Sequence, residues 1–208
     1  MKFKNIIFDW SGVIKDAVID HGWVVNKMFE KLGGKGIDLD EMRQNWEQPY
    51  MKFWNKYYPK MTLEEEQKIY YEAILDKDCP SARAYPGIVE LIKRLKNRGF
   101  AMVILSSDPQ KTLFDEMDKF GLKDIFIDSV VNIHDKSREI EALIKRNNFK
   151  KEETVFVGDT NHEIEVGRLA GIKTVAVTWG LYPENRLEAL NPDYLVHNIE
   201  ELEKVLLK

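Results

Sequence analysis

The fold is decided near the start of the chain by residues 3–13, which read FKNIIFDWSGV. The mostly apolar run from Phe3 to Phe8 has the length of a buried β-strand, and Asp9 follows it directly. In open parallel sheets, ligands gather outside the carboxyl ends of the strands. A strand that ends in a carboxylate therefore indicates where to look for functional groups along the rest of the chain.

From residue 85 onward, short apolar runs alternate with amphipathic segments. The apolar runs predict strands at residues 101–105, 125–130, 154–157, 173–177 and 194–196. The amphipathic segments predict helices at residues 88–98, 110–120, 137–147 and 164–170, three of which are followed by a glycine suited to a left-handed C-cap. This alternation is typical of an α/β protein with a Rossmann-like, doubly wound parallel sheet.

Residues 17–78 interrupt this alternation, because every periodic stretch there is helical and is rich in aromatic and Met side chains. Asp38 with Glu41, and Thr62 with Glu65, have the spacing of capping boxes that begin two of the helices. We therefore predict a core domain of residues 1–16 and 82–208. An all-helical cap domain of residues 17–81 is inserted into it after the first strand.

Composition excludes several protein classes. The 208 residues are 44% hydrophobic and 32% charged, which is ordinary for a globular protein, and the net charge of −4 argues against a nucleic-acid partner. No apolar run approaches the ~18 residues of a membrane span, and the start has no signal-peptide core. With a single cysteine, Cys79, we expect a cytoplasmic protein without a membrane partner, either a monomer or a homodimer.

Chemically useful side chains follow several of the predicted strands. Asp9 follows the first, Ser106 and Ser107 follow the second, and Asp159 and Glu163 follow the fourth. Lys136 opens the helix that precedes the fourth strand. Carboxylates suit a divalent cation, while lysine and hydroxyl groups suit phosphate oxygens. The sheet edge is therefore a candidate site for phosphoryl chemistry.

The order of these motifs resembles that of the haloacid dehalogenase superfamily over nearly the whole chain. The matching features are a strand ending in Asp-x-x-Gly-Val at residues 9–13, a strand ending in Ser106, a downstream Lys136, and Val-Gly-Asp at residues 157–159. The resemblance implies the strand order 5-4-1-2-3. The helical insertion resembles the C1 cap of phosphoglycolate phosphatase and beta-phosphoglucomutase relatives.

The resemblance also implies roles for individual residues. Asp9 would be the nucleophile that forms an aspartyl-phosphate. Asp9, Asp159 and the main-chain carbonyl of Ser11 would hold Mg²⁺, with Glu163 in support. The phosphoryl oxygens would bind Lys136 and the hydroxyl groups of Ser106 and its neighbour Ser107.

Each assignment has a structural alternative. Lys136 has the sequence context of an ordinary surface lysine, and Glu163 would favour the start of a helix through its dipole. Ser106, Ser107 and Asp108 would serve equally as an N-cap cluster for the next helix.

Ser11 is the main departure from the family pattern, because the phosphatases normally carry an aspartate there as the acid/base group. Serine is a poor base without a partner, so its presence predicts slower turnover by ~10² to 10⁴. His21 is a candidate substitute, since its ordinary pKa lies near neutrality.

The favoured hypothesis is a Mg²⁺-dependent phosphatase of a small phosphorylated metabolite. The alternatives are a catalytically weak relative that binds a ligand or a protein, and a phosphonatase-like enzyme that cleaves a carbon–phosphorus bond.

Overall fold

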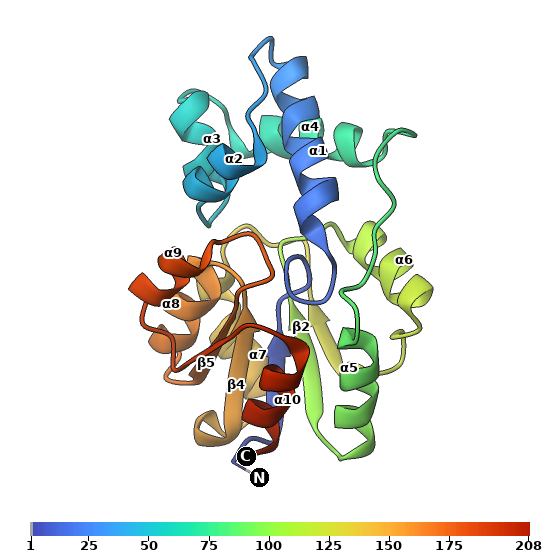
Figure 1. The fold of residues 1–208 in the computed structure, drawn as a ribbon, viewed down its shortest axis with the longest axis vertical. Helices are drawn as coiled ribbons and strands as arrows, with labels where there is room; N and C mark the ends of the chain where they lie inside the picture. Colours follow the sequence, from blue (N-terminus) through green and yellow to red (C-terminus); the bar gives the residue numbers. More distant parts are fainter. Residues whose placement is uncertain (1) are drawn as a thin grey trace.

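The computed structural model describes residues 2–208 and contains a six-stranded parallel sheet with helices on both faces (Figure 1). The order across the sheet is β3-β2-β1-β4-β5-β6. The predicted order 5-4-1-2-3 is therefore confirmed, and β6 extends the sheet beyond β5. The strands are β1 (Asn5–Phe8), β2 (Ala101–Leu105), β3 (Asp128–Val130), β4 (Thr154–Gly158), β5 (Lys173–Val177) and β6 (Tyr194–Val196).

Strand β1 lies at the centre because all of its residues are buried and both of its edges are paired. Ile7 aligns with Val103 of β2 on one side and with Phe156 of β4 on the other. Successive side chains point to opposite faces, so Ile6 and Phe8 pack in one core cluster and Ile7 in another. A strand buried on both faces explains the nearly continuous apolar run in the sequence.

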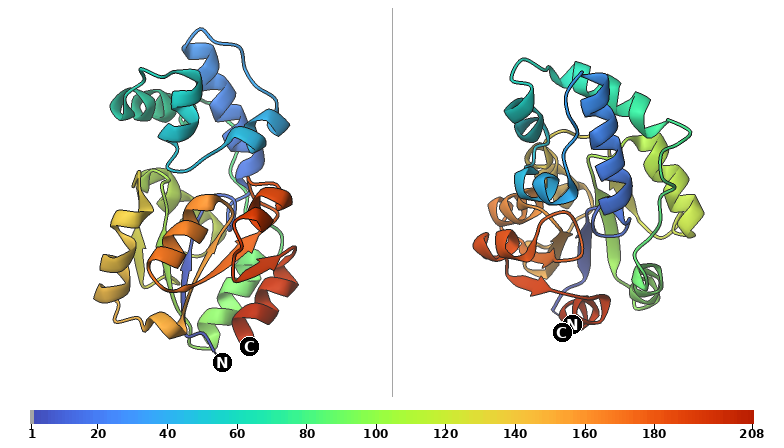
Figure 2. Two further views of the ribbon diagram at one scale, coloured as in Figure 1. Left: turned by 90° about the vertical axis from the view of Figure 1, so that its left-hand side faces the viewer. Right: turned by 45° about the horizontal axis from the view of Figure 1, so that its top comes forward.

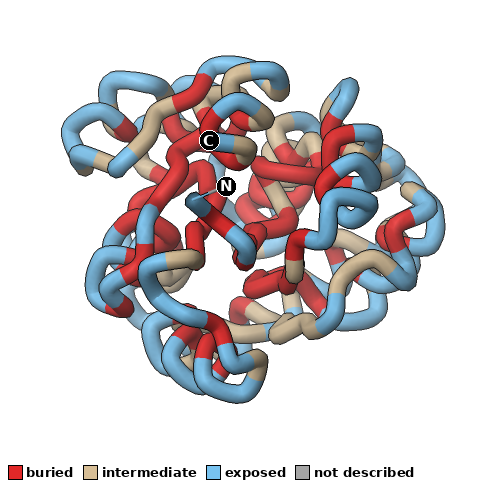
Figure 3. Tube along the Cα trace, turned by 90° about the horizontal axis from the view of Figure 1, so that it is seen from below, coloured by how far each residue is buried: buried red, intermediate tan, exposed pale blue. Residues whose placement is uncertain are grey.

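Helices cover the two faces of the sheet separately (Figure 2). Apolar side chains of α5 (Ile88–Asn97), α6 (Gln110–Phe120) and α10 (Ile199–Leu207) pack with one face. Those of α7 (Ile140–Arg146) and α8 (Asn161–Leu169) pack with the other. The buried strands accordingly lie at the centre of the core, while the outer turns of the helices are exposed (Figure 3). None of the helices within residues 2–208 is long and apolar enough to span a membrane.

Four helices lie beyond the carboxyl edge of the sheet (Figure 1): α1 (Ala17–Lys31), α2 (Leu39–Asn45), α3 (Met51–Tyr57) and α4 (Leu63–Ile74). Residues 17–81 contain no strand in the structure. Their apolar cluster also includes Ile164, Tyr182 and Leu187 of the core, so packing continues across the predicted boundary. The division at residues 16/17 and 81/82 stays a prediction.

Some element boundaries differ from those predicted. The third strand begins at Asp128 rather than residue 125, because the N–H of Ile125 is bonded to the carbonyl of Leu122 in a turn. A short 3₁₀ helix (Lys136–Arg138) precedes α7, and a second one (Lys151–Glu153) precedes β4. Helices α9 (Glu184–Ala189) and α10 were not predicted.

The capping motifs are partly as predicted. Thr62 and Glu65 form a complete capping box at the start of α4. Asp38 accepts a hydrogen bond from the N–H of Glu41, but α2 has only this half of the motif.

Candidate active site

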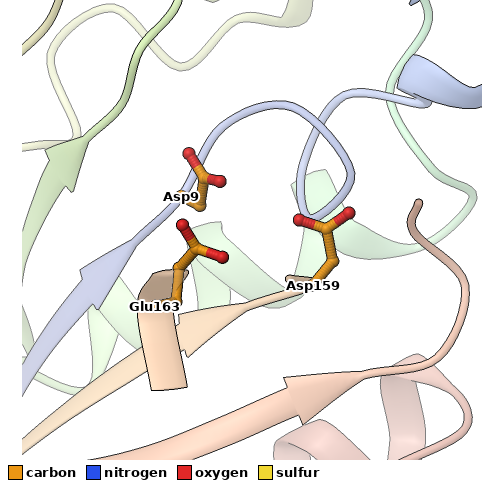
Figure 4. A group of neighbouring side chains, drawn as sticks. All are labelled: Asp9, Asp159 and Glu163. Atoms are coloured by element: carbon orange, nitrogen blue, oxygen red, sulfur yellow. The ribbon is translucent and has the colours of Figure 1, made fainter. Parts of the chain in front are cut away.

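Three acidic side chains meet at the carboxyl edge of the sheet (Figure 4). Asp9 follows β1, Asp159 follows β4, and Glu163 lies in the first turn of α8. One carboxylate oxygen of each lies within 4.8 Å of the others, and all three side chains are buried. Because β1 and β4 are neighbouring parallel strands, residues far apart in the sequence reach the same point.

One lysine pairs with two of these carboxylates. The Nζ of Lys136 lies 2.8 Å from Oδ2 of Asp9 and also donates a hydrogen bond to Oε1 of Glu163. Burial alone would lower the pKa of Lys136, but the two carboxylates raise it above its ordinary range, so the side chain is charged at neutral pH. Lys136 is only 1% exposed and is therefore not an ordinary surface lysine.

The cluster carries excess negative charge. Burial raises the pKa of Asp9 to about 7, since repulsion by Glu163 also opposes the attraction of Lys136. Burial, followed by repulsion from Glu163 and Asp9, raises the pKa of Asp159 well above its ordinary range. One ammonium group does not balance three buried carboxylates, so a further cation would stabilise their ionised forms.

Asp159 shows where such a cation would bind. Its Oδ2 accepts the N–H of Leu181 at 2.7 Å, whereas its Oδ1 is buried without a partner among residues 2–208. A buried carboxylate oxygen without a partner is costly, and hard divalent cations prefer oxygen ligands. The residues present therefore fit a magnesium ion.

Two glycines allow the backbone to approach Asp159. Gly12 has a φ of +82°, and a Cβ built there would lie 2.0 Å from Oδ2 of Asp159. A Cβ at Gly180 would lie 2.3 Å from the Cβ of Asp159. The loop that contains the Ser11 carbonyl is thus held against this carboxylate.

Glu163 serves two purposes. Its Oε2 accepts hydrogen bonds from the hydroxyl group of Thr160 at 2.7 Å and from its N–H at 3.1 Å, which completes a capping box at the start of α8. Burial opposes ionisation of Glu163, yet Lys136 and His162 lower its pKa to about 2. The helix-start explanation and membership of the acidic cluster are therefore compatible.

The loop after β2 supplies hydroxyl groups. The Oγ of Ser106 donates to Oδ2 of Asp108 at 2.7 Å, and the Oγ of Ser107 is buried with no partner among the described residues. Pro109 occupies the N-cap of α6, and no side chain caps this helix. The explanation of this loop as an N-cap cluster is therefore wrong.

Ser11 belongs to a buried ionic network that the sequence analysis missed. Its Oγ donates to Oδ1 of Asp108 at 2.8 Å. The Nζ of Lys15 lies 2.9 Å from Asp20, 3.3 Å from Glu116 and 3.9 Å from Asp108. Lys15 is 3% exposed, but a lone loop lysine whose partners are distant in the chain has no recognisable sequence pattern.

A cavity lies over Asp9, between the sheet edge and the helices above it. The cavity is large enough for several waters. Every predicted site residue except Glu163 lines it. The residues contributed from 17–81 include His21, Glu66, Trp46, Tyr50, Trp54, Tyr70 and Tyr71.

Comparison with known proteins agrees with this geometry. The family model of haloacid dehalogenase-like hydrolases matches residues 6–177. The chain belongs to this family. Phosphoglycolate phosphatase of Synechococcus elongatus is 26% identical over 204 residues, which cover 96% of this chain and 95% of that protein.

Two further comparisons concern a shorter match and the fold. Pyrophosphatase PpaX of Halalkalibacterium halodurans is 31% identical over 123 residues, and this match spans 57% of each protein. The structure of a haloacid dehalogenase-like hydrolase from Streptococcus pneumoniae superimposes with a TM-score of 0.84 at 21% identity, covering 98% of both chains. At that identity the superposition supports the fold alone.

In this haloacid dehalogenase-like hydrolase, His21 reaches the cavity from α1. Its ring packs edge-on against Trp46 with 4.3 Å between centroids, and its Nε2 is buried without a partner among residues 2–208. Burial lowers the pKa of His21 to about 4, so the ring is neutral at pH 7. The pKa of His21 therefore lies below the ordinary value on which the expectation rested, and its role as a substitute acid/base group stays a prediction.

Proposed function

We propose that this chain is a Mg²⁺-dependent phosphatase that hydrolyses a small phosphorylated metabolite through an aspartyl-phosphate on Asp9. The observation that carries the proposal is the 2.8 Å ion pair between Lys136 and Asp9, beside Oδ1 of Asp159, which has no hydrogen-bond partner among the described residues. Asp9, Lys136 and Asp159 line one cavity, which supports the roles of nucleophile, phosphate ligand and cation ligand. The names of two relatives, a phosphoglycolate phosphatase and a pyrophosphatase, support phosphate chemistry.

In the first step, a carboxylate oxygen of Asp9 would bond to phosphorus as the bond to the leaving alcohol breaks. Lys136 and the hydroxyl groups of Ser106 and Ser107 would hold the phosphoryl oxygens. Mg²⁺, held by Asp9, Asp159 and the Ser11 carbonyl with Glu163 in support, would offset the repulsion between carboxylate and phosphate.

Proton transfer would use Asp108 together with Ser11. Ser11 stands where the family's phosphatases carry an acid/base aspartate, and its hydroxyl group is bonded to Asp108. In the second step, water would attack phosphorus, the bond to Asp9 would break, and the water proton would pass through the Ser11 hydroxyl to Asp108. Asp108 would return this proton to the leaving oxygen of the next substrate, which balances the cycle.

The alternatives have less support. The phosphonatase-like route needs a cap lysine that forms a Schiff base, but within the described chain the only lysine that lines the cavity is Lys136 of the sheet edge. A binding protein without turnover was suggested by Ser11. The carboxylate of Asp108 beside it weakens that argument.

The test is phosphate release from 4-nitrophenyl phosphate with Mg²⁺, combined with acid quenching to trap phosphorylated protein. We expect steady turnover that a chelator abolishes and added Mg²⁺ restores, together with phosphate label on Asp9. Binding of phosphate or beryllium fluoride without turnover or label would instead favour the binding protein.

A further inference from the structure

The roof of the cavity, formed by the lining side chains of residues 17–81, has no lysine or arginine in the part of the chain that the structure describes. Within residues 2–208, Lys136 is the only lysine or arginine that lines the cavity, and it is already paired with Asp9 and Glu163. His21 on the roof is neutral at pH 7, because burial lowers its pKa to about 4. A second anionic group on the substrate, such as a carboxylate or another phosphate, would therefore be desolvated without a counter-charge.

The roof instead contains a buried carboxyl group, Glu66. Glu66 lies in the first turn of α4, is 3% exposed and lines the cavity. No lysine, arginine or histidine among the described residues forms an ion pair with it. Burial raises its pKa to about 8, although a hydrogen bond with Trp54 acts in the opposite direction. A cation bound beside such a buried carboxyl group would stabilise its ionised form.

Aromatic rings share the roof with Glu66. Trp54, Tyr50 and Tyr70 line the same cavity, as do Trp46 and Tyr71. Faces of such rings attract ammonium groups, most strongly where water is excluded. A carboxyl group among aromatic rings is a suitable binding site for an organic cation.

We propose that the substrate is the phosphate monoester of an amino alcohol, with its phosphate at Asp9 and its ammonium group at Glu66 and the aromatic roof. The proposal rests on the phosphatase function and adds the class of substrate. It also predicts that phosphoglycolate and pyrophosphate, which the names of the two relatives suggest, are poor substrates here.

The test compares esters that differ only in charge. Choline phosphate is paired with 3,3-dimethylbutyl phosphate, its neutral isostere, and 2-aminoethyl phosphate with propyl phosphate. The two pairs distinguish a quaternary from a primary ammonium group. We expect kcat/KM to be at least ~10-fold higher for one ammonium ester than for its neutral partner, and higher still relative to phosphoglycolate.

Glu66→Gln removes the ionisable group at nearly constant volume. It should abolish the preference for the ammonium ester, measured as the ratio of kcat/KM between the two esters of a pair, and circular dichroism tests whether the variant is folded. Glu64→Gln is the matched control, because Glu64 lies on the same helix but is exposed. It should leave both rates unchanged.

Binding to Asp9→Asn protein, measured by calorimetry, separates this proposal from the phosphatase function. If the wild-type protein hydrolyses no ester, but Asp9→Asn still binds the ammonium esters more tightly than their neutral partners, the phosphatase function fails and the proposed ammonium site stands. Equal affinity and turnover for charged and neutral esters, a preference for phosphoglycolate, or an unchanged preference in Glu66→Gln would overturn the proposal.

Discussion

Buried charge is compensated differently on the two sides of the cavity, which are the floor at the sheet edge and the roof formed by residues 17–81. At the floor, one carboxylate oxygen each of Asp9, Asp159 and Glu163 lies within 4.8 Å of the others, and Lys136 pairs with Asp9 and Glu163. On the roof, Glu66 is buried among aromatic rings and forms no ion pair with any other residue of 2–208. Under the proposed function, the floor would bind a cation and the phosphoryl group that all esters share. The roof would contact the part of the substrate that differs from one ester to another.

This difference predicts that different residues determine the reaction and the choice of substrate. Floor residues come from the ends of β1, β2 and β4 and from the segments around Lys136 and Glu163. Roof residues come from the helical insertion. Substitutions on the floor should therefore change kcat for every ester, whereas substitutions on the roof should change the ranking of esters.

The largest effect is expected for Asp9→Asn. An amide cannot attack phosphorus in place of the carboxylate, so kcat should fall by at least ~10⁴ for every ester. The fold should remain, as judged by circular dichroism. Asp124→Asn, at an exposed loop position, is the control and should retain full activity. Retained activity in Asp9→Asn would remove Asp9 from the nucleophile role.

Asp108→Asn should lower kcat by ~10², within the range that positioned acid/base groups supply. Because water attack then loses its base, acid quenching should reveal accumulated phosphorylated protein. Asp115→Asn, on the exposed face of α6, is the control. His21→Ala should lower kcat little. A strong loss with His21→Ala and none with Asp108→Asn would reverse the assignment of the acid/base group.

Ser11→Asp should raise kcat by ~10-fold by placing a carboxyl group beside Asp9. It should also restore turnover to the Asp108→Asn protein, since the new group replaces the one that was lost. Steady-state kinetics of the two single variants and the double variant measure this coupling. Additive effects would show that Ser11 and Asp108 act independently.

The smallest effect concerns thermal stability. Asp9 has a pKa raised from 3.8 to about 7, so its contribution to stability is present at low pH and is lost as pH rises through 7. The Tm of metal-free Asp9→Asn relative to wild type should therefore rise between pH 5 and pH 8. In wild type, the increase in Tm caused by Mg²⁺ should be larger at pH 8 than at pH 5.

The measurement of Tm against pH, with and without Mg²⁺, also distinguishes the acidic groups of the floor from Glu66 on the roof. Glu66, with its pKa raised to about 8, loses its contribution in a similar pH range. Mg²⁺ should not restore that part, because Glu66 does not belong to the acidic cluster. Asp159→Asn should remove most of the response to Mg²⁺. An unchanged response would place the cation elsewhere.

Much of the fold followed from local pattern. Helix α6 has the predicted bounds, because Pro109 precedes it and Gly121 ends it in the left-handed conformation. The central strands are continuous apolar runs because they are buried on both faces. Strand β3 was predicted too long because Ile125 and Phe126 are apolar but pack on the core from a turn. An amphipathic pattern at α10, with Asn198 as its N-cap, was present but was not recognised.

The sequence by itself determined the parallel sheet and the positions of Asp9 and Asp159 near its carboxyl edge, because period and strand ends are local properties. The choice of Lys136 came from the family resemblance. Glu66 had a usable signal, since it shares a helix face with Ile69, Tyr70 and Ala73. Only the tertiary structure decided which charges are compensated. Distances between remote segments and exclusion of water decide this, and no local pattern encodes them. They set the contacts of Lys15 with Asp108 and Glu116, the low pKa of His21 and the burial of Glu66 without an ion pair among the described residues.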